Sequence, residues 1–87
     1  MPESVYLRSR AACERVLSGL PVGTHVDIIE ILRAAPGIHW RALQEALHRL
    51  SDEGRVYVKT RDPGWNRRPR IDHVVVRVVI AGPSGVA

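Results

Sequence analysis

Basic side chains are concentrated in the last third of this sequence. Residues 1–54 hold six Arg against seven Asp or Glu, whereas residues 55–77 hold seven Arg or Lys against two Asp, within a formal net charge of +4. Clustered cations attract polyanions, because each phosphate that a protein neutralises releases condensed counterions. The charge distribution therefore predicts a phosphate-binding surface built from the region 55–77.

Within that region, five cations lie in or beside one segment that is punctuated by Gly and Pro. They are Lys59, Arg61, Arg67, Arg68 and Arg70. We expect them to contact nucleic-acid phosphates, since a merely solvated hairpin tip usually mixes charges and only Asp62 opposes them here. Trp65 and Asn66 at the tip add a group that could stack on or wedge between bases. The alternative is that Trp65 folds back on Tyr57.

A second set of polar groups lies on a predicted helix over residues 39–53. Leu43, Ala46, Leu47 and Leu50 recur at the spacing of one helix face, and polar residues occupy the opposite face. Arg can read guanine and Gln can read adenine in the DNA major groove. The candidates for contact with base edges are Arg41, Gln44 and His48, and Trp40 could pack on a sugar or on a thymine methyl group.

Each of these helix candidates also has an ordinary structural explanation. Trp40 could be a core residue beside Ile38, because large aromatic side chains are often buried. Glu45 is better explained as a solvated charge paired with Arg41 or Arg49 one helical turn away than as a reader of cytosine. A surface histidine such as His48 often has no special role.

Two more helices are expected before this one. Apolar positions predict a first helix over residues 5–18, with Ser4 as a candidate N-cap and Gly19 as its stop. An extended connection over 20–23 follows. Thr24 and Asp27 have the spacing of a capping box, which predicts a second helix over 25–34. Pro36 and its neighbours then make a sharp turn into the third helix.

Strand patterns follow the third helix. Gly54 can provide a left-handed cap, residues 55–60 alternate as a strand, and residues 71–80 alternate as a longer strand. The intervening loop over 61–70 is too long for a tight turn. Residues 1–80 are thus expected to form a single domain, and 81–87 a flexible C-terminal tail.

The order helix, extended piece, helix, turn, helix, strand, basic loop, strand resembles the winged helix-turn-helix family. The stretch 43–56, with leucines at helical spacing followed by Gly54 and Val56, resembles the recognition helix of bacterial winged-helix regulators. The resemblance implies an α+β fold: a three-helix bundle plus a C-terminal two- or three-stranded β-hairpin wing. It further implies that the helix over 39–53 reads the major groove while the wing over 59–70 contacts phosphate or the minor groove.

Other chemistry has little support in the sequence. Cys13 is the only cysteine, so neither an internal disulfide nor a usual zinc motif is expected. The four histidines are scattered without ligand spacing, and no phosphate loop or nucleophile motif is found. We expect no catalysis, cofactor, metal or small-molecule ligand. With no apolar run long enough for a bilayer, a cytoplasmic, nucleoid-associated protein is predicted.

The favoured partner is double-stranded DNA, with the chain acting as a small transcriptional regulator. A two-fold homodimer is compatible with this, through the first helix or the strand over 71–80, whose longer end would lack a neighbour. One alternative is a winged-helix module that binds protein, which calls for an apolar wing and recognition helix. Another is a sequence-independent binder of double-stranded or structured nucleic acid, in which the wing dominates.

Overall fold

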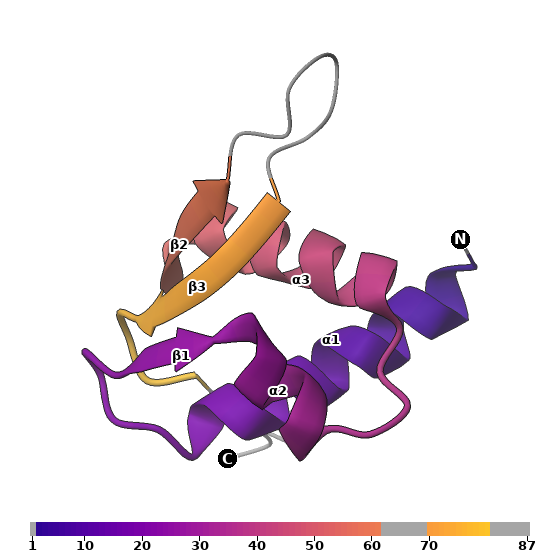
Figure 1. The fold of residues 1–87 in the computed structure, drawn as a ribbon, viewed down its shortest axis with the longest axis horizontal. Helices are drawn as coiled ribbons and strands as arrows, with labels where there is room; N and C mark the ends of the chain where they lie inside the picture. Colours follow the sequence, from indigo (N-terminus) through magenta and orange to yellow (C-terminus); the bar gives the residue numbers. More distant parts are fainter. Residues whose placement is uncertain (1, 62–69, 81–87) are drawn as a thin grey trace.

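The protein has an α+β fold with three helices and a three-stranded antiparallel sheet (Figure 1). The computed structural model describes residues 2–61 and 70–80, so most of the predicted basic loop and the whole predicted tail lie outside it. The elements are α1 (Glu3–Ser18), β1 (His25–Asp27), α2 (Ile28–Ala34), α3 (Trp40–Asp52), β2 (Val56–Arg61) and β3 (Arg70–Val76). Within the described ranges, no helix is both long and apolar enough to span a bilayer.

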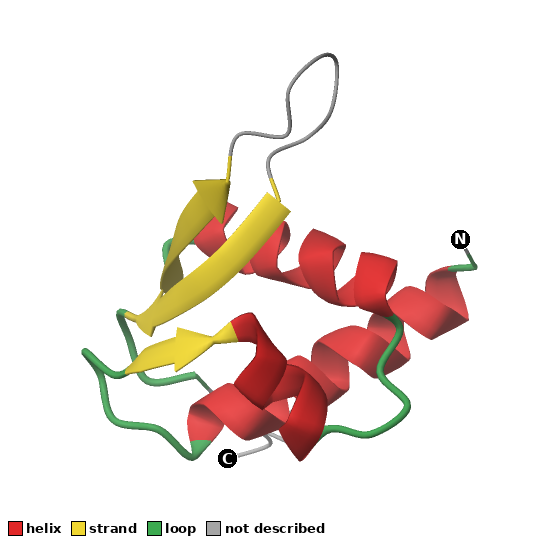
Figure 2. Ribbon diagram, in the orientation of Figure 1, coloured by secondary structure: helices red, strands yellow, loops and turns green. Residues whose placement is uncertain are grey.

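The strands follow the order β1-β3-β2, so β3 is central and pairs antiparallel with both neighbours. The helices gather on one side of this sheet (Figure 2). Val56, Val74 and Val76 turn toward them and are almost completely buried. The opposite sheet face carries polar side chains and is open to solvent.

The apolar stripe predicted for the third helix is confirmed. Leu43, Leu47 and Leu50 are fully buried and form the middle of one core cluster, to which every helix and every strand contributes. Burial of such leucines stabilises a fold by about 1.5–3 kcal/mol per side chain. The predicted left-handed turn is also present, since Gly54 follows α3 with a φ of 79°.

The start of the second helix was predicted too early. Residues 25–27 form β1, and Asp27 is the N-cap of α2, its Oδ1 accepting a 2.9 Å hydrogen bond from the Ile29 N–H. Thr24 instead donates its hydroxyl to the Pro21 carbonyl at 2.7 Å. The reason is tertiary: pairing with β3 gives this segment backbone partners and buries Val26.

The strand predicted over residues 71–80 was also predicted to extend too far. β3 ends at Val76, because the Arg55 N–H donates to the Leu50 carbonyl instead of pairing with β3, and the N–H groups of Arg77 and Val78 share the Arg55 carbonyl. Since residues 77–80 are not part of a strand, the unpaired strand end proposed as a dimer surface is not available.

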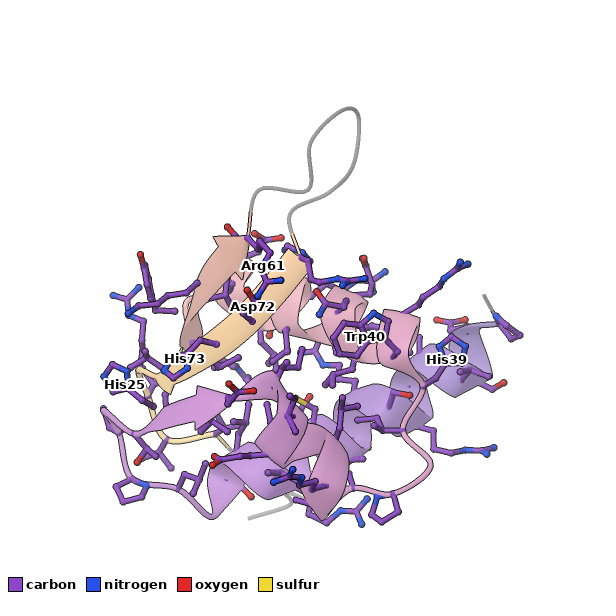
Figure 3. All side chains as sticks on the ribbon, viewed as in Figure 1. His25, His39, Trp40, Arg61, Asp72 and His73 are labelled. Atoms are coloured by element: carbon purple, nitrogen blue, oxygen red, sulfur yellow. The ribbon has the colours of Figure 1, made fainter. Side chains whose placement is uncertain are left out.

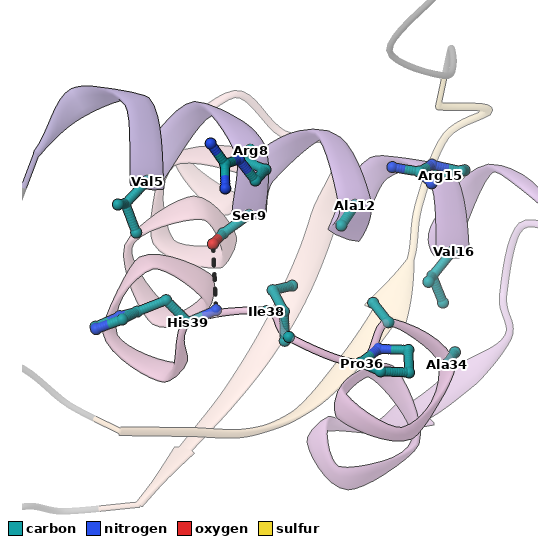
Figure 4. A pocket seen from close by; sticks show the side chains of 12 residues that line it. Val5, Arg8, Ser9, Ala12, Arg15, Val16, Ala34, Pro36, Ile38 and His39 are labelled. Carbon is teal, nitrogen blue, oxygen red and sulfur yellow. Dashed lines mark hydrogen bonds between the residues drawn. The ribbon is translucent and has the colours of Figure 1, made fainter.

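Helix α1 begins at Glu3, with Pro2 rather than Ser4 at the N-cap position. Ser9, which interrupts the apolar stripe in the sequence, is nevertheless buried. Its hydroxyl oxygen accepts a 3.3 Å hydrogen bond from the His39 N–H, just before α3 (Figure 4). A polar residue in the stripe therefore positions the start of α3.

Cys13 is expected to be chemically inert in the folded protein. Burial raises the pKa of its thiol from 9.0 to about 12. At pH 8 the thiolate fraction, and with it the labelling rate by a disulfide reagent, should be lower than in denaturant by roughly 10³. Equal rates in both states would contradict this burial.

Because the pKa of the Cys13 thiol is higher in the folded protein, the contribution of Cys13 to stability is complete below pH 9 and is lost as pH rises toward 12.

Candidate nucleic-acid interface

The side chain of Gln44 joins α3 to the start of β3. Its Nε2 donates to the Ile71 carbonyl at 3.0 Å, and the Ile71 N–H donates to its Oε1 at 2.9 Å. Ile71 is fully buried, so these backbone groups have little access to water. The amide predicted to read adenine is therefore engaged in holding the hairpin, and a base contact would require both hydrogen bonds to break.

Trp40, the first residue of α3, is partly buried and packs against the core, in line with the alternative considered for it. The guanidinium carbon of Arg70 lies 5.4 Å from the centre of its ring, which is a cation–π distance. This contact and the two hydrogen bonds of Gln44 fix the base of the hairpin beside the first turns of α3.

The base of the hairpin carries further charge. Arg61 lies opposite Arg70 in the strand register, and its Nε donates to Asp72 Oδ2 at 3.0 Å. The register shifts between Lys59 and Thr60, which leaves Asp72 as the extra residue of a bulge. The Arg61 charge is thus partly compensated by Asp72, whereas Lys59 is exposed on β2.

The polar side chains of α3 differ in their exposure and in the residues that they contact. Arg41 is exposed in the first turn and His48 is half-buried. Glu45 accepts a 3.2 Å hydrogen bond from Arg49, as the alternative for Glu45 anticipated. This bond raises the pKa of Arg49. The Arg49 guanidinium also lies 4.2 Å from the centre of the Tyr6 ring, so it is turned toward α1.

An ion network at the far end of α3 was not apparent from the sequence. Arg10 of α1 donates to the Tyr6 hydroxyl, to Glu14 and to both carboxylate oxygens of Glu53. Desolvation lowers the pKa of Arg10, but the hydrogen bonds outweigh it and raise that pKa above its usual range. Arg10 therefore ties α1 to the end of α3 and does not belong to the candidate interface.

A groove of about 460 Å³ lies between α1 and the connection from α2 to α3 (Figure 4). Ala12, Val16 and Ile38 supply apolar walls, and Arg8 and Arg15 are its charged lining residues. None of the residues predicted to contact DNA lines it. The groove is consequently separate from the candidate interface.

The predicted contact residues therefore fall into three groups. Trp40, Gln44 and Arg70 are brought together at the junction of α3 and β3. Arg41, His48, Lys59 and Arg61 lie on α3 and β2. Trp65, Asn66, Arg67 and Arg68 lie outside the described residues.

The structure also brings together two histidines that were predicted to be scattered. His25 Nδ1 on β1 and His73 Nε2 on β3 are 3.1 Å apart (Figure 3). Alternation along neighbouring strands could have indicated this pair, but residues 25–27 were predicted to be helical. A wrong element assignment thus concealed a contact between side chains.

Comparisons with models of protein families, with curated proteins and with solved structures gave no match to this chain.

Proposed function

We propose that this chain is a DNA-binding protein of the winged helix-turn-helix type, acting as a small transcriptional regulator. The observation that carries the proposal is the junction between α3 and the hairpin. Gln44 and Trp40 hold Ile71 and Arg70 against the start of α3, so that the charged base of the hairpin lies beside a helix turn that bears the exposed Arg41.

This geometry supports distinct roles for the residues. In this proposal Arg41 reads a guanine in the major groove, and Arg70 and Lys59 contact phosphates. Arg61 can join them by exchanging Asp72 for a phosphate oxygen. Gln44 is reassigned from base reading to positioning the hairpin. The roles proposed for residues 65–68 rest on the sequence alone.

The distribution of charge along α3 bears on specificity. Glu45 and Asp52 lie on its later turns, where Arg49 donates to Glu45, so the positive charge of the candidate interface comes from Arg41 in the first turn and from the hairpin base. Contacts to phosphates should therefore supply most of the affinity. A charged hairpin base also favours nucleic acid over the protein-binding alternative. A homodimer through α1 stays a prediction.

The test is binding to duplex DNA, measured by fluorescence anisotropy at several salt concentrations with random and genome-selected sequences. For Lys59→Ala/Arg70→Ala we expect weaker binding to every sequence and a salt slope that falls by about 1 for each lost phosphate contact. For Arg41→Ala we expect loss of sequence preference by about 1–3 kcal/mol for one good base contact.

The control is Arg15→Ala/Arg33→Ala, which removes the same number of charges from exposed positions on α1 and α2. It should leave the salt slope almost unchanged. If this control weakens binding as much as Lys59→Ala/Arg70→Ala, the attraction is non-specific to the whole surface. Absence of any salt-dependent DNA binding by the wild type would favour the protein-interaction alternative.

A further inference from the structure

The two histidines that meet across the sheet form a pair with defined geometry. His25 and His73 lie diagonally on neighbouring strands, since His25 pairs with Val75 and His73 pairs with Asp27. Their rings have centroids 5.2 Å apart and planes inclined by 46°. The His25 Nδ1 and His73 Nε2 atoms are 3.1 Å apart on the solvent side of the sheet. One hydrogen bond between neutral rings fits this arrangement, but so does a shared ligand.

We propose that His25 and His73 form a two-nitrogen binding site for a divalent transition-metal ion such as Zn²⁺. Zinc bonds imidazole nitrogen at about 2.0–2.1 Å, so two nitrogens at a tetrahedral angle are about 3.3 Å apart. The same bond length at a right angle, typical of square-planar ions, gives about 2.9 Å. The observed 3.1 Å lies between these values. To bind an ion, the rings must turn so that both facing lone pairs point to it.

Metal binding by a neutral histidine pair requires one imidazole proton to move. Each neutral imidazole carries one N–H, and one of these protons lies between the two facing nitrogens. When the ion binds, the proton moves to the outer nitrogen of the same ring, so a neutral pair releases no net proton. Acidification opposes binding, because an imidazolium has no free lone pair to offer.

The charged side chains next to the two histidines have opposite signs, so they do not strongly attract a cation. Asp27 of β1 and Lys59 of β2 lie on either side of His73 in the strand register, and Tyr57 lies across Val75 from His25. Asp27 uses Oδ1 to cap α2. Among the described residues no group of three or more His, Cys, Asp or Glu has metal-binding geometry. The described part of the chain therefore supplies two ligands, and water or a ligand from another molecule completes the coordination.

Binding of the ion should stabilise the position of β1, which few other interactions connect to the rest of the fold. β1 has three residues, and it leads without a loop into α2. An ion held by His25 and His73 would fasten β1 to β3 from the solvent side, and with it α2 to the hairpin. A ligand that binds only the folded state raises stability by RT ln(1 + [L]/Kd).

The experiment is a titration of tag-free protein with ZnCl₂ at pH 7.5, followed by thermal unfolding and by the imidazole proton NMR signals. At a tenfold excess of free Zn²⁺ over Kd we expect Tm to rise by about 6–11 °C. The signals of His25 and His73 should shift together and saturate at one ion per chain or one ion per two chains. MgCl₂, which prefers oxygen ligands, should have no effect.

Two substitutions give the matched comparison. His25→Gln should lower Zn²⁺ affinity about tenfold or more, which reduces the rise in Tm at the same Zn²⁺ concentration to about 3 °C or less. His39→Asn removes a histidine elsewhere but retains a side chain suited to the N-cap of α3, so its Tm should rise like that of the wild type. The proposal is overturned if Zn²⁺ leaves the wild-type signals unchanged, or if His25→Gln responds to Zn²⁺ as the wild type does. Neither result depends on whether the chain binds DNA.

Discussion

Replacing Gln44 with leucine is expected to lower the free energy of unfolding by about 2–4 kcal/mol. The substitution keeps an apolar stem of similar size but leaves the N–H and the carbonyl of Ile71 without their side-chain partners. Ile71 is fully buried, so water cannot easily replace these two hydrogen bonds. Urea denaturation monitored by circular dichroism measures the change, and hydrogen exchange should show faster exchange of the Ile71 amide.

Gln44→Glu provides a sharper version of the same test. The carboxylate can still accept from the Ile71 N–H, but it cannot donate to the Ile71 carbonyl and places two oxygens against each other. It should therefore also destabilise the fold. Arg41→Leu is the control, because it introduces the same side chain at an exposed position of α3 and should change stability by less than about 0.5 kcal/mol. If Gln44→Leu left stability unchanged, the positioning role would be contradicted and Gln44 would again be a candidate for reading a base.

Leu47→Ala is expected to destabilise the protein by about 2–5 kcal/mol, the usual range for a buried leucine. Leu47 lies in the middle of α3 with none of its surface exposed, in the cluster that joins the helices to the sheet. Removing its side chain leaves a cavity that the surrounding helices and strands can only partly fill. The measurement is again the free energy of unfolding in urea.

Leu7→Ala is the matched control, since it makes the same chemical change at a helix position that is 54% exposed. Its effect should stay within about 0.5 kcal/mol. Similar losses in both variants would mean that α3 does not occupy the centre of the core as described. At about 4–8 °C per kcal/mol for a domain of this size, a loss of 2–5 kcal/mol is readily visible in the melting temperature.

Several features could be predicted from the sequence because they depend on local patterns. Leucine spacing in α3 places four apolar residues on one face, whatever packs against that face. Gly54 can adopt its positive φ without steric cost, which ends the helix and lets β2 start at Val56, one residue later than predicted. The excess of basic residues over 55–77 is likewise a property of the chain itself. The α+β class followed from these local signals.

The tertiary structure decided the features that depend on a distant partner. Residues 25–27 have a plausible helix start in sequence, yet they form β1 because β3 offers them hydrogen bonds from about fifty residues further along the chain. The same pairing places β3 in the centre of the sheet and brings His25 to His73.

The hydrogen-bond partners of individual polar side chains also depended on the tertiary structure. Periodicity placed Gln44 on the polar face of α3, but it could not show that the backbone of Ile71 would lie within hydrogen-bonding distance. Likewise, Ser9 breaks an apolar stripe in sequence and becomes a buried partner of His39 in the fold. The sequence by itself determined which face of a helix is apolar and where cations are concentrated. Only the tertiary structure determined which polar groups are engaged within the fold, because a hydrogen bond depends on the position of both partners.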